Sequence, residues 1–137
     1  MKPIDYLKAA GTALLLLILN VAISFPVVGV WRALFEPQTP PQEVALRIAP
    51  WSSHLVGPVL FFAAAWLLAR RRSERNGLAM AGAVCAFYVL LEAASVTGYP
   101  DGPAMLLTLT FALAMAAKVA AALLGAVLAR RRPAQAV

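Results

Sequence analysis

The sequence predicts an all-α membrane protein, an up-down-up-down bundle of four transmembrane helices that forms one domain over residues 1–137. Three observations predict it. Four apolar segments reach about the 20 residues that a helix needs to cross roughly 30 Å of hydrocarbon. Most Lys and Arg residues gather in clusters at alternate ends of these segments. The chain is 62% hydrophobic and only 13% charged, which is too apolar for a soluble domain.

The first predicted span covers residues 6–31, because no charged side chain lies between Lys8 and Arg32. A secretory signal peptide is the competing interpretation, with residues 22–24 as its small-x-small cleavage site. The apolar run continues well past that site, which favours a membrane span. Pro26 lacks a backbone donor and crowds the preceding turn, so we expect a kink there.

A polar, proline-rich connection over residues 36–50 follows, and it is electrically neutral, as an external loop can be. Residues 42–48 are expected to form a short helix at the membrane surface. The second span is predicted over residues 51–69, with Ser52 or Ser53 as its N-terminal cap, and it ends at a basic cluster.

The third span is predicted over residues 77–96 and the fourth over residues 104–129. Between them, Pro100-Asp101-Gly102-Pro103 indicates a tight turn, because proline presets φ and glycine accepts positive φ. The last two spans are therefore expected to form an antiparallel hairpin. The third carries one charged residue, Glu92, and the fourth carries Lys118 near its middle.

Orientation follows from the basic clusters, since Lys and Arg are retained on the cytoplasmic side. The clusters predict a bacterial cytoplasmic (inner) membrane with both termini in the cytoplasm. They consist of Lys2, Lys8, Arg70, Arg71, Arg72, Arg75, Arg130, Arg131 and Arg132.

The net charge of +6 does not indicate a nucleic-acid partner, because the basic residues flank apolar spans instead of covering a soluble face. Anionic lipid headgroups at the Arg clusters are the expected partner. A chain of 137 residues is also small enough to assemble, so a homo-oligomer or a larger membrane complex is a further hypothesis.

Polar residues inside the predicted spans form the candidate site. An ionisable group in the bilayer centre costs from about 2.5 to more than about 10 kcal/mol, so such groups normally face the bundle interior or water. Counting about 1.5 Å per residue from the inner boundary predicts two polar layers, roughly 18 and 24 Å deep. The layer at about 18 Å, near the midplane, contains Asn20, Tyr88 and Lys118. The layer one turn further out contains Ser24, His54 and Glu92.

Glu92 and Lys118 are predicted to form an ion pair, because their side chains lean toward each other on antiparallel helices. Three interpretations remain open at this point. The pair fixes the packing of the hairpin, or it lines a polar path in which Glu92 titrates, or each residue reaches a membrane surface separately. His54 is either solvated at the outer end or part of a proton relay.

Small residues predict how the third and fourth spans pack. They recur at every fourth position, which lets membrane helices approach closely. The third span carries Gly82 and Ala86, and the fourth carries Ala117, Ala121, Gly125 and Ala129.

Catalytic, metal and cofactor motifs are not recognisable in the sequence. One cysteine, Cys85, makes no internal disulfide, and one histidine cannot supply two axial haem ligands. We therefore predict no metal site and no cofactor. The leading functional hypothesis is a small transport-type protein whose polar centre handles protons or a small polar solute. The alternatives are a non-catalytic accessory or assembly subunit of a membrane complex and, third, a membrane-embedded enzyme.

Overall fold

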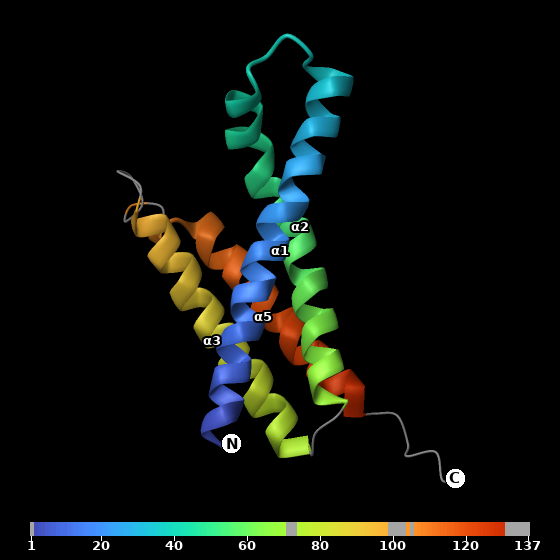
Figure 1. The fold of residues 1–137 in the computed structure, drawn as a ribbon, viewed down its shortest axis with the longest axis vertical. Helices are drawn as coiled ribbons and strands as arrows, with labels where there is room; N and C mark the ends of the chain where they lie inside the picture. Colours follow the sequence, from blue (N-terminus) through green and yellow to red (C-terminus); the bar gives the residue numbers. More distant parts are fainter. Residues whose placement is uncertain (1, 71–73, 99–103, 105, 131–137) are drawn as a thin grey trace, which may run out of the picture.

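The computed structural model of the chain contains four long helices (Figure 1). They are α1 (Pro3–Phe35), α2 (Pro41–Ala69), α3 (Glu74–Thr97) and α5 (Leu109–Arg130). The structure describes residues 2–70, 74–98, 104 and 106–130. Each of the four helices is long and apolar enough to cross a membrane. The predicted class, an all-α bundle of four membrane-spanning helices, is confirmed.

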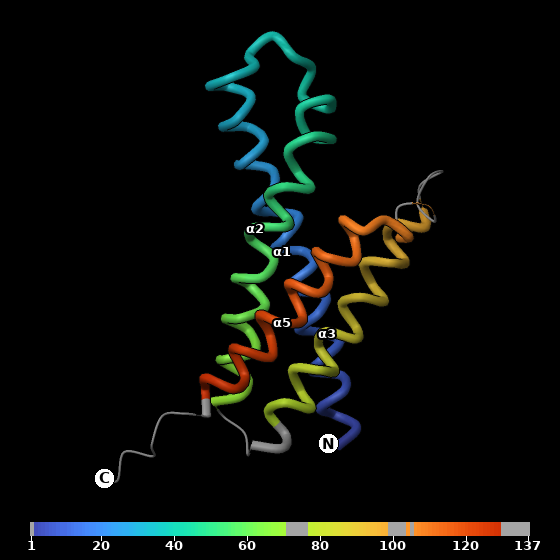
Figure 2. Tube along the Cα trace, turned by 180° about the vertical axis from the view of Figure 1, so that it is seen from behind, coloured from blue at the N-terminus to red at the C-terminus, as the bar shows by residue number. Residues whose placement is uncertain are grey.

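The bundle places consecutive helices antiparallel, but the order of neighbours differs from the order in the chain. α1 and α5 each pack against both α2 and α3, and the contact between α2 and α5 is the most extensive. α2 and α3 also touch, whereas α1 and α5 make no contact in the described part of the chain. Figure 2 shows α5 running obliquely, from beside the C-terminal end of α3 to beside the C-terminal end of α2. α2 and α5 are therefore parallel neighbours.

The N-terminal part of α2 differs from the prediction, because the helix begins at Pro41 and not at Trp51. The surface helix expected at residues 42–48 is the first part of α2, and Pro50 lies inside the helix. Membrane helices tolerate such a proline when other groups satisfy the freed backbone atoms. The carbonyl that Pro50 leaves without a helical donor is that of Leu46, four residues earlier. Two residues after the proline, the Ser52 hydroxyl donates to the carbonyl of Ala49 at 2.9 Å.

α1 is also longer than predicted, and its C-terminal end projects with the N-terminal end of α2 beyond the ends of α3 and α5 (Figure 1). An ion pair and hydrogen bonds stabilise the connection between α1 and α2. Arg47 pairs with Glu36, and the Trp31 indole donates to the same carboxylate at 3.1 Å. The Trp31 hydrogen bond and the Arg47 charge lower the pKa of Glu36 below 4.5. Arg32 donates to the carbonyl of Thr39 at 2.9 Å.

The start of α5 lies at Leu109, five residues after the predicted Ala104. Thr108 explains this boundary, because its hydroxyl accepts a hydrogen bond from the backbone N–H of Phe111 at 3.2 Å. A threonine that accepts from the first turn is a favourable N-cap. The turn predicted at residues 100–103 lies outside the described residues.

On α2 and α5, residues at every fourth position are buried, and most of them are small. Such rows form ridges that fit the grooves of a neighbouring helix. The buried row of α2 consists of Gly57, Phe61, Ala65 and Ala69. The corresponding buried row of α5 consists of Ala114, Lys118, Ala122 and Ala126, and Lys118 meets Gly57 of α2.

Gly125 marks the closest approach, and its neighbour is α2, not α3 as the sequence predicted. A Cβ at Gly125 would lie 2.4 Å from the carbonyl oxygen of Phe62. On α3, by contrast, Gly82 and Ala86 are exposed, and a Cβ at Gly82 would meet nothing within 4 Å. The expected contact surface of α3 is therefore corrected: these two residues face away from the bundle.

The predicted stripe on α5 changes from exposed to buried along the helix. Ala117 is exposed, Ala121 is half-buried, and Ala129 is buried. A helix has 3.6 residues per turn, so each step of four residues rotates the side chain by about 40°. The three steps of the stripe rotate it by about 120° in all. The four residues of the stripe therefore cannot all contact the same neighbouring helix along one straight line.

A candidate polar site inside the bundle

Polar side chains from all four helices meet inside the bundle and form hydrogen bonds between helices. α1 contributes Asn20 and Ser24, α2 contributes Ser52 and Ser53, α3 contributes Tyr88 and Glu92, and α5 contributes Lys118. Five of these seven belong to the predicted layers. Depth along the helix axis therefore identified most of the members.

Lys118 is the central charge of the site, and its side chain is only 2% exposed. Its ammonium nitrogen lies 3.1 Å from Glu92 Oε2 and 3.3 Å from Oε1, which is the predicted ion pair. It also donates to the Tyr88 hydroxyl at 3.3 Å. The three N–H donors of the lysine thus have three acceptor oxygens, as a buried charge requires.

Gly57 makes room for this lysine, and the sequence analysis did not identify it. A Cβ at Gly57 would lie 2.7 Å from Lys118 Cε. The side chain of Lys118 therefore passes directly over the backbone of α2. The small residues Gly57, Ala65 and Ala69, spaced at multiples of four, were a sequence signal for this face, because membrane helix contacts favour small residues at such intervals.

Tyr88 joins the charged pair to α1. Its hydroxyl accepts a hydrogen bond from Asn20 Nδ2 at 3.3 Å, and its ring meets Phe61 edge to face with centroids 4.6 Å apart. Asn20 Nδ2 also donates to the hydroxyl of Ser53 at 2.7 Å. Asn20 is 6% exposed, and its Oδ1 has no hydrogen-bond partner. The network therefore contains one unused buried acceptor.

Ser52 and Ser53 were predicted only as helix caps, and the structure places them in the network instead. The hydroxyls of Ser24 and Ser52 lie 2.7 Å apart, which links α1 to α2. Because α2 begins ten residues earlier than predicted, both serines lie inside the helix. Their place in the outer polar layer was the signal that could have identified them.

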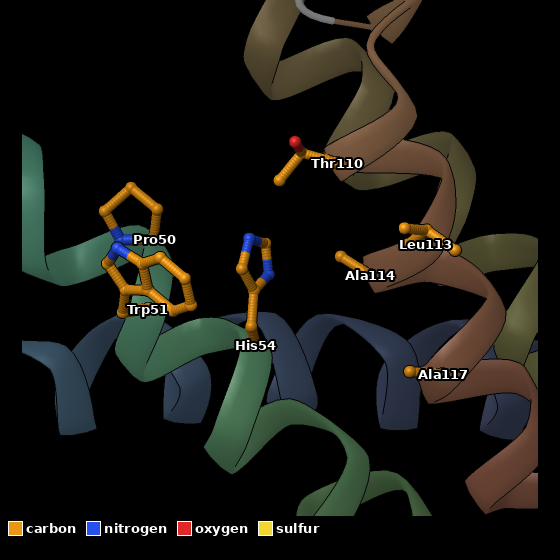
Figure 3. A pocket seen from close by; sticks show the side chains of 7 residues that line it. All are labelled: Pro50, Trp51, His54, Thr110, Leu113, Ala114 and Ala117. Carbon is orange, nitrogen blue, oxygen red and sulfur yellow. The ribbon is translucent and has the colours of Figure 1, made fainter.

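His54 does not join this network, although its depth placed it in the same layer. The imidazole lies between Trp51 and α5 and borders a separate cavity of about 390 Å³ with Thr110, Leu113 and Ala117 (Figure 3). Its Nδ1 atom is buried without a hydrogen-bond partner. One residue along a helix rotates the side chain by about 100°, so His54 and Ser53 face different directions.

A second cavity of about 700 Å³ borders the network on the side of α1 and α2. Its walls are mostly apolar, and they include Leu17, Val21, Phe25, Val28, Ala45 and Leu46. Its polar lining consists of Asn20, Ser24, Gln42, Ser53, Glu92 and Ser95. The Glu92 side chain is 19% exposed, so this carboxylate touches both the buried lysine and the cavity.

The described residues contain no group of three His, Cys, Asp or Glu side chains that could hold a metal ion. Cys85 is a buried free thiol. The chemistry available in the network is that of a carboxylate, an ammonium, a phenol, an amide and hydroxyls, which can bind a polar group or transfer a proton.

Comparisons of the chain with protein-family models, curated proteins and solved structures found no match. A function for the site is therefore inferred from its own geometry and chemistry.

Proposed function

We propose that this multi-pass membrane protein is a small transport-type protein whose polar centre handles protons or a small polar solute. One observation carries the proposal: Glu92 is paired with the buried Lys118 and also lines the 700 Å³ cavity. Ionisable residues within membrane spans commonly mark ion or solute pathways. Contact with a cavity would not add to the stability of an ion pair that only fixed the packing of the helices.

The hydrogen-bonded network connects Glu92 to side chains of all four helices, so protonation of Glu92 would affect each of them. Protonation of the carboxylate would weaken its attraction for Lys118, and the ammonium would then depend more on Tyr88. Tyr88 is bonded to Asn20, and Asn20 is bonded to Ser53. A change of charge on α3 would in this way alter contacts between α5, α1 and α2.

Proton flux through proteoliposomes tests the proposal, with a pH-sensitive dye trapped inside the vesicles. We expect the variant that combines Glu92→Leu with Lys118→Met to fold but to lose the flux, because no titratable group remains at the cavity. The conservative variant Glu92→Gln should lose it as well. Thr12→Val is the matched control, since the Thr12 hydroxyl donates to the Lys8 carbonyl outside the network. Undiminished flux in a stable double variant would rule out this role and favour an accessory subunit.

The proposed location is the inner membrane of a bacterium with cytoplasmic termini. The start of α1, the end of α2, the start of α3 and the end of α5 lie at one end of the bundle, which supports a common side for the basic clusters (Figure 2). At that end Arg70 lies over the Trp66 ring, 4.3 Å from its centroid.

Cysteine labelling in inside-out and right-side-out vesicles tests the orientation. In a Cys85→Ala background, Gln38→Cys should react with an impermeant thiol reagent only from outside and Ser73→Cys only from inside. Reaction of both from the same side would contradict four spans in this orientation.

A further inference from the structure

The cavity beside Glu92 has features that restrict what it can bind, provided that the proposed function of this site holds. Its volume of about 700 Å³ lies within the range of roughly 300 to 1,000 Å³ that small-molecule sites occupy. Phe25, Val28 and Leu46 line it together with other apolar side chains. An occupant therefore needs an apolar body that can replace lipid or water along these walls.

The unused hydrogen-bonding capacity of the polar lining is mainly that of acceptors. Asn20 Oδ1 is buried without a partner, and a buried acceptor left unpaired is costly. Glu92 receives two hydrogen bonds from Lys118, whereas a carboxylate offers about four acceptor positions. Both residues line the cavity. A ligand that satisfies them must donate hydrogen bonds.

The charges restrict the ligand further. Glu92 is the only residue with a formal charge among the described residues that line the cavity, and Lys118 neutralises it at 3.1 Å. A cationic headgroup would leave one unbalanced positive charge in a site of low dielectric, and an anionic one would meet acceptors and a carboxylate. Unbalanced buried charge is strongly unfavourable. A neutral donor avoids both costs.

We propose that this cavity binds a neutral amphiphile whose hydroxyl headgroup donates to Glu92 and Asn20 while its alkyl chain lies along α1 and α2. This deepens the proposed function by naming the solute class. Neutral, hydroxyl-bearing molecules with one alkyl chain are the compounds that fit.

Photo-crosslinking tests the site directly. The probe is a dodecanol analogue with a diazirine in its chain, added to the full chain in phosphatidylcholine nanodiscs and located by mass spectrometry. Crosslinks should fall on the stretches of α1 and α2 that line the cavity. Unlabelled dodecanol should compete roughly tenfold better than dodecylammonium or dodecanoate, as expected for one unbalanced charge or unpaired acceptor. Better competition by either ion, or crosslinks spread evenly over lipid-facing residues, would overturn the proposal.

Two variants separate cavity binding from general partitioning into the lipid. Ala45 lines the cavity and its side chain takes no part in the hydrogen-bonded network, so Ala45→Trp should fill the cavity and abolish the localised crosslinks. Ala63→Trp, on an exposed position of the same helix, should leave them unchanged. Asn20→Leu should weaken competition by dodecanol about tenfold, because it removes one acceptor. Equal crosslinking in Ala45→Trp and Ala63→Trp would contradict a cavity site.

The two proposals fail in different ways. Loss of localised crosslinking with intact, Glu92-dependent proton flux would refute the neutral-amphiphile class and leave the transport role standing. Localised crosslinking without any flux would establish the binding site and refute transport.

Discussion

Replacing Lys118 with alanine should lower the free energy of unfolding by roughly 3 to 5 kcal/mol, because it leaves the Glu92 carboxylate without its partner in a low-dielectric interior. The converse variant, Glu92→Ala, should cost a similar amount, since the lysine side chain is only 2% exposed and cannot reach water without rearrangement. Chemical unfolding in detergent, followed by circular dichroism, measures both changes.

Removing both charges together should cost far less than removing either one. Apolar replacements of similar volume, Glu92→Leu with Lys118→Met, avoid the desolvation of two charges, and such exchanges are often nearly neutral. Arg47→Ala is the control, because the Arg47 and Glu36 side chains are exposed to 56% and 23% and such pairs contribute at most about 1 kcal/mol. If Lys118→Ala costs no more than Arg47→Ala, the pair is solvated and its proposed environment is wrong.

The second large effect is expected at Gly125. A methyl group there would meet the carbonyl oxygen of Phe62 at 2.4 Å and its carbonyl carbon at 3.1 Å, and backbone atoms cannot rotate aside. Gly125→Ala should therefore force α2 and α5 apart and cost about 1 to 3 kcal/mol, the usual range for overpacking. The same unfolding assay measures it.

Gly82→Ala provides a control that is expected to change stability in the opposite direction. A Cβ at Gly82 meets nothing within 4 Å, and alanine is favoured over glycine inside a helix by about 0.5 to 1 kcal/mol. The two identical substitutions should thus move stability in opposite directions. Destabilisation by Gly82→Ala with a neutral Gly125→Ala would mean that α5 approaches α3 and not α2.

The sequence by itself determined the class of the protein and the number of spans, and it predicted the contact between Glu92 and Lys118. These features depend on position along the chain. Hydrophobic length defines a span, and the rise of about 1.5 Å per residue converts sequence number into depth. Two opposite charges one helical turn apart in depth on adjacent antiparallel helices can then form a pair, because their side chains lean toward each other. The start of α2 was misplaced because proline was taken to end a helix, whereas the helix continues through Pro50.

Only the tertiary structure decided which helices are neighbours and which side of each helix faces inward. Depth does not specify rotation about the helix axis, so His54 was placed with Glu92 although it faces another cavity. The stripe on α5 was assigned to α3, whereas Gly125 meets α2. Spacing and depth pointed to Gly57 and Ser53, but their contacts, like the cavity beside Glu92, depend on side chains that two or more helices bring together.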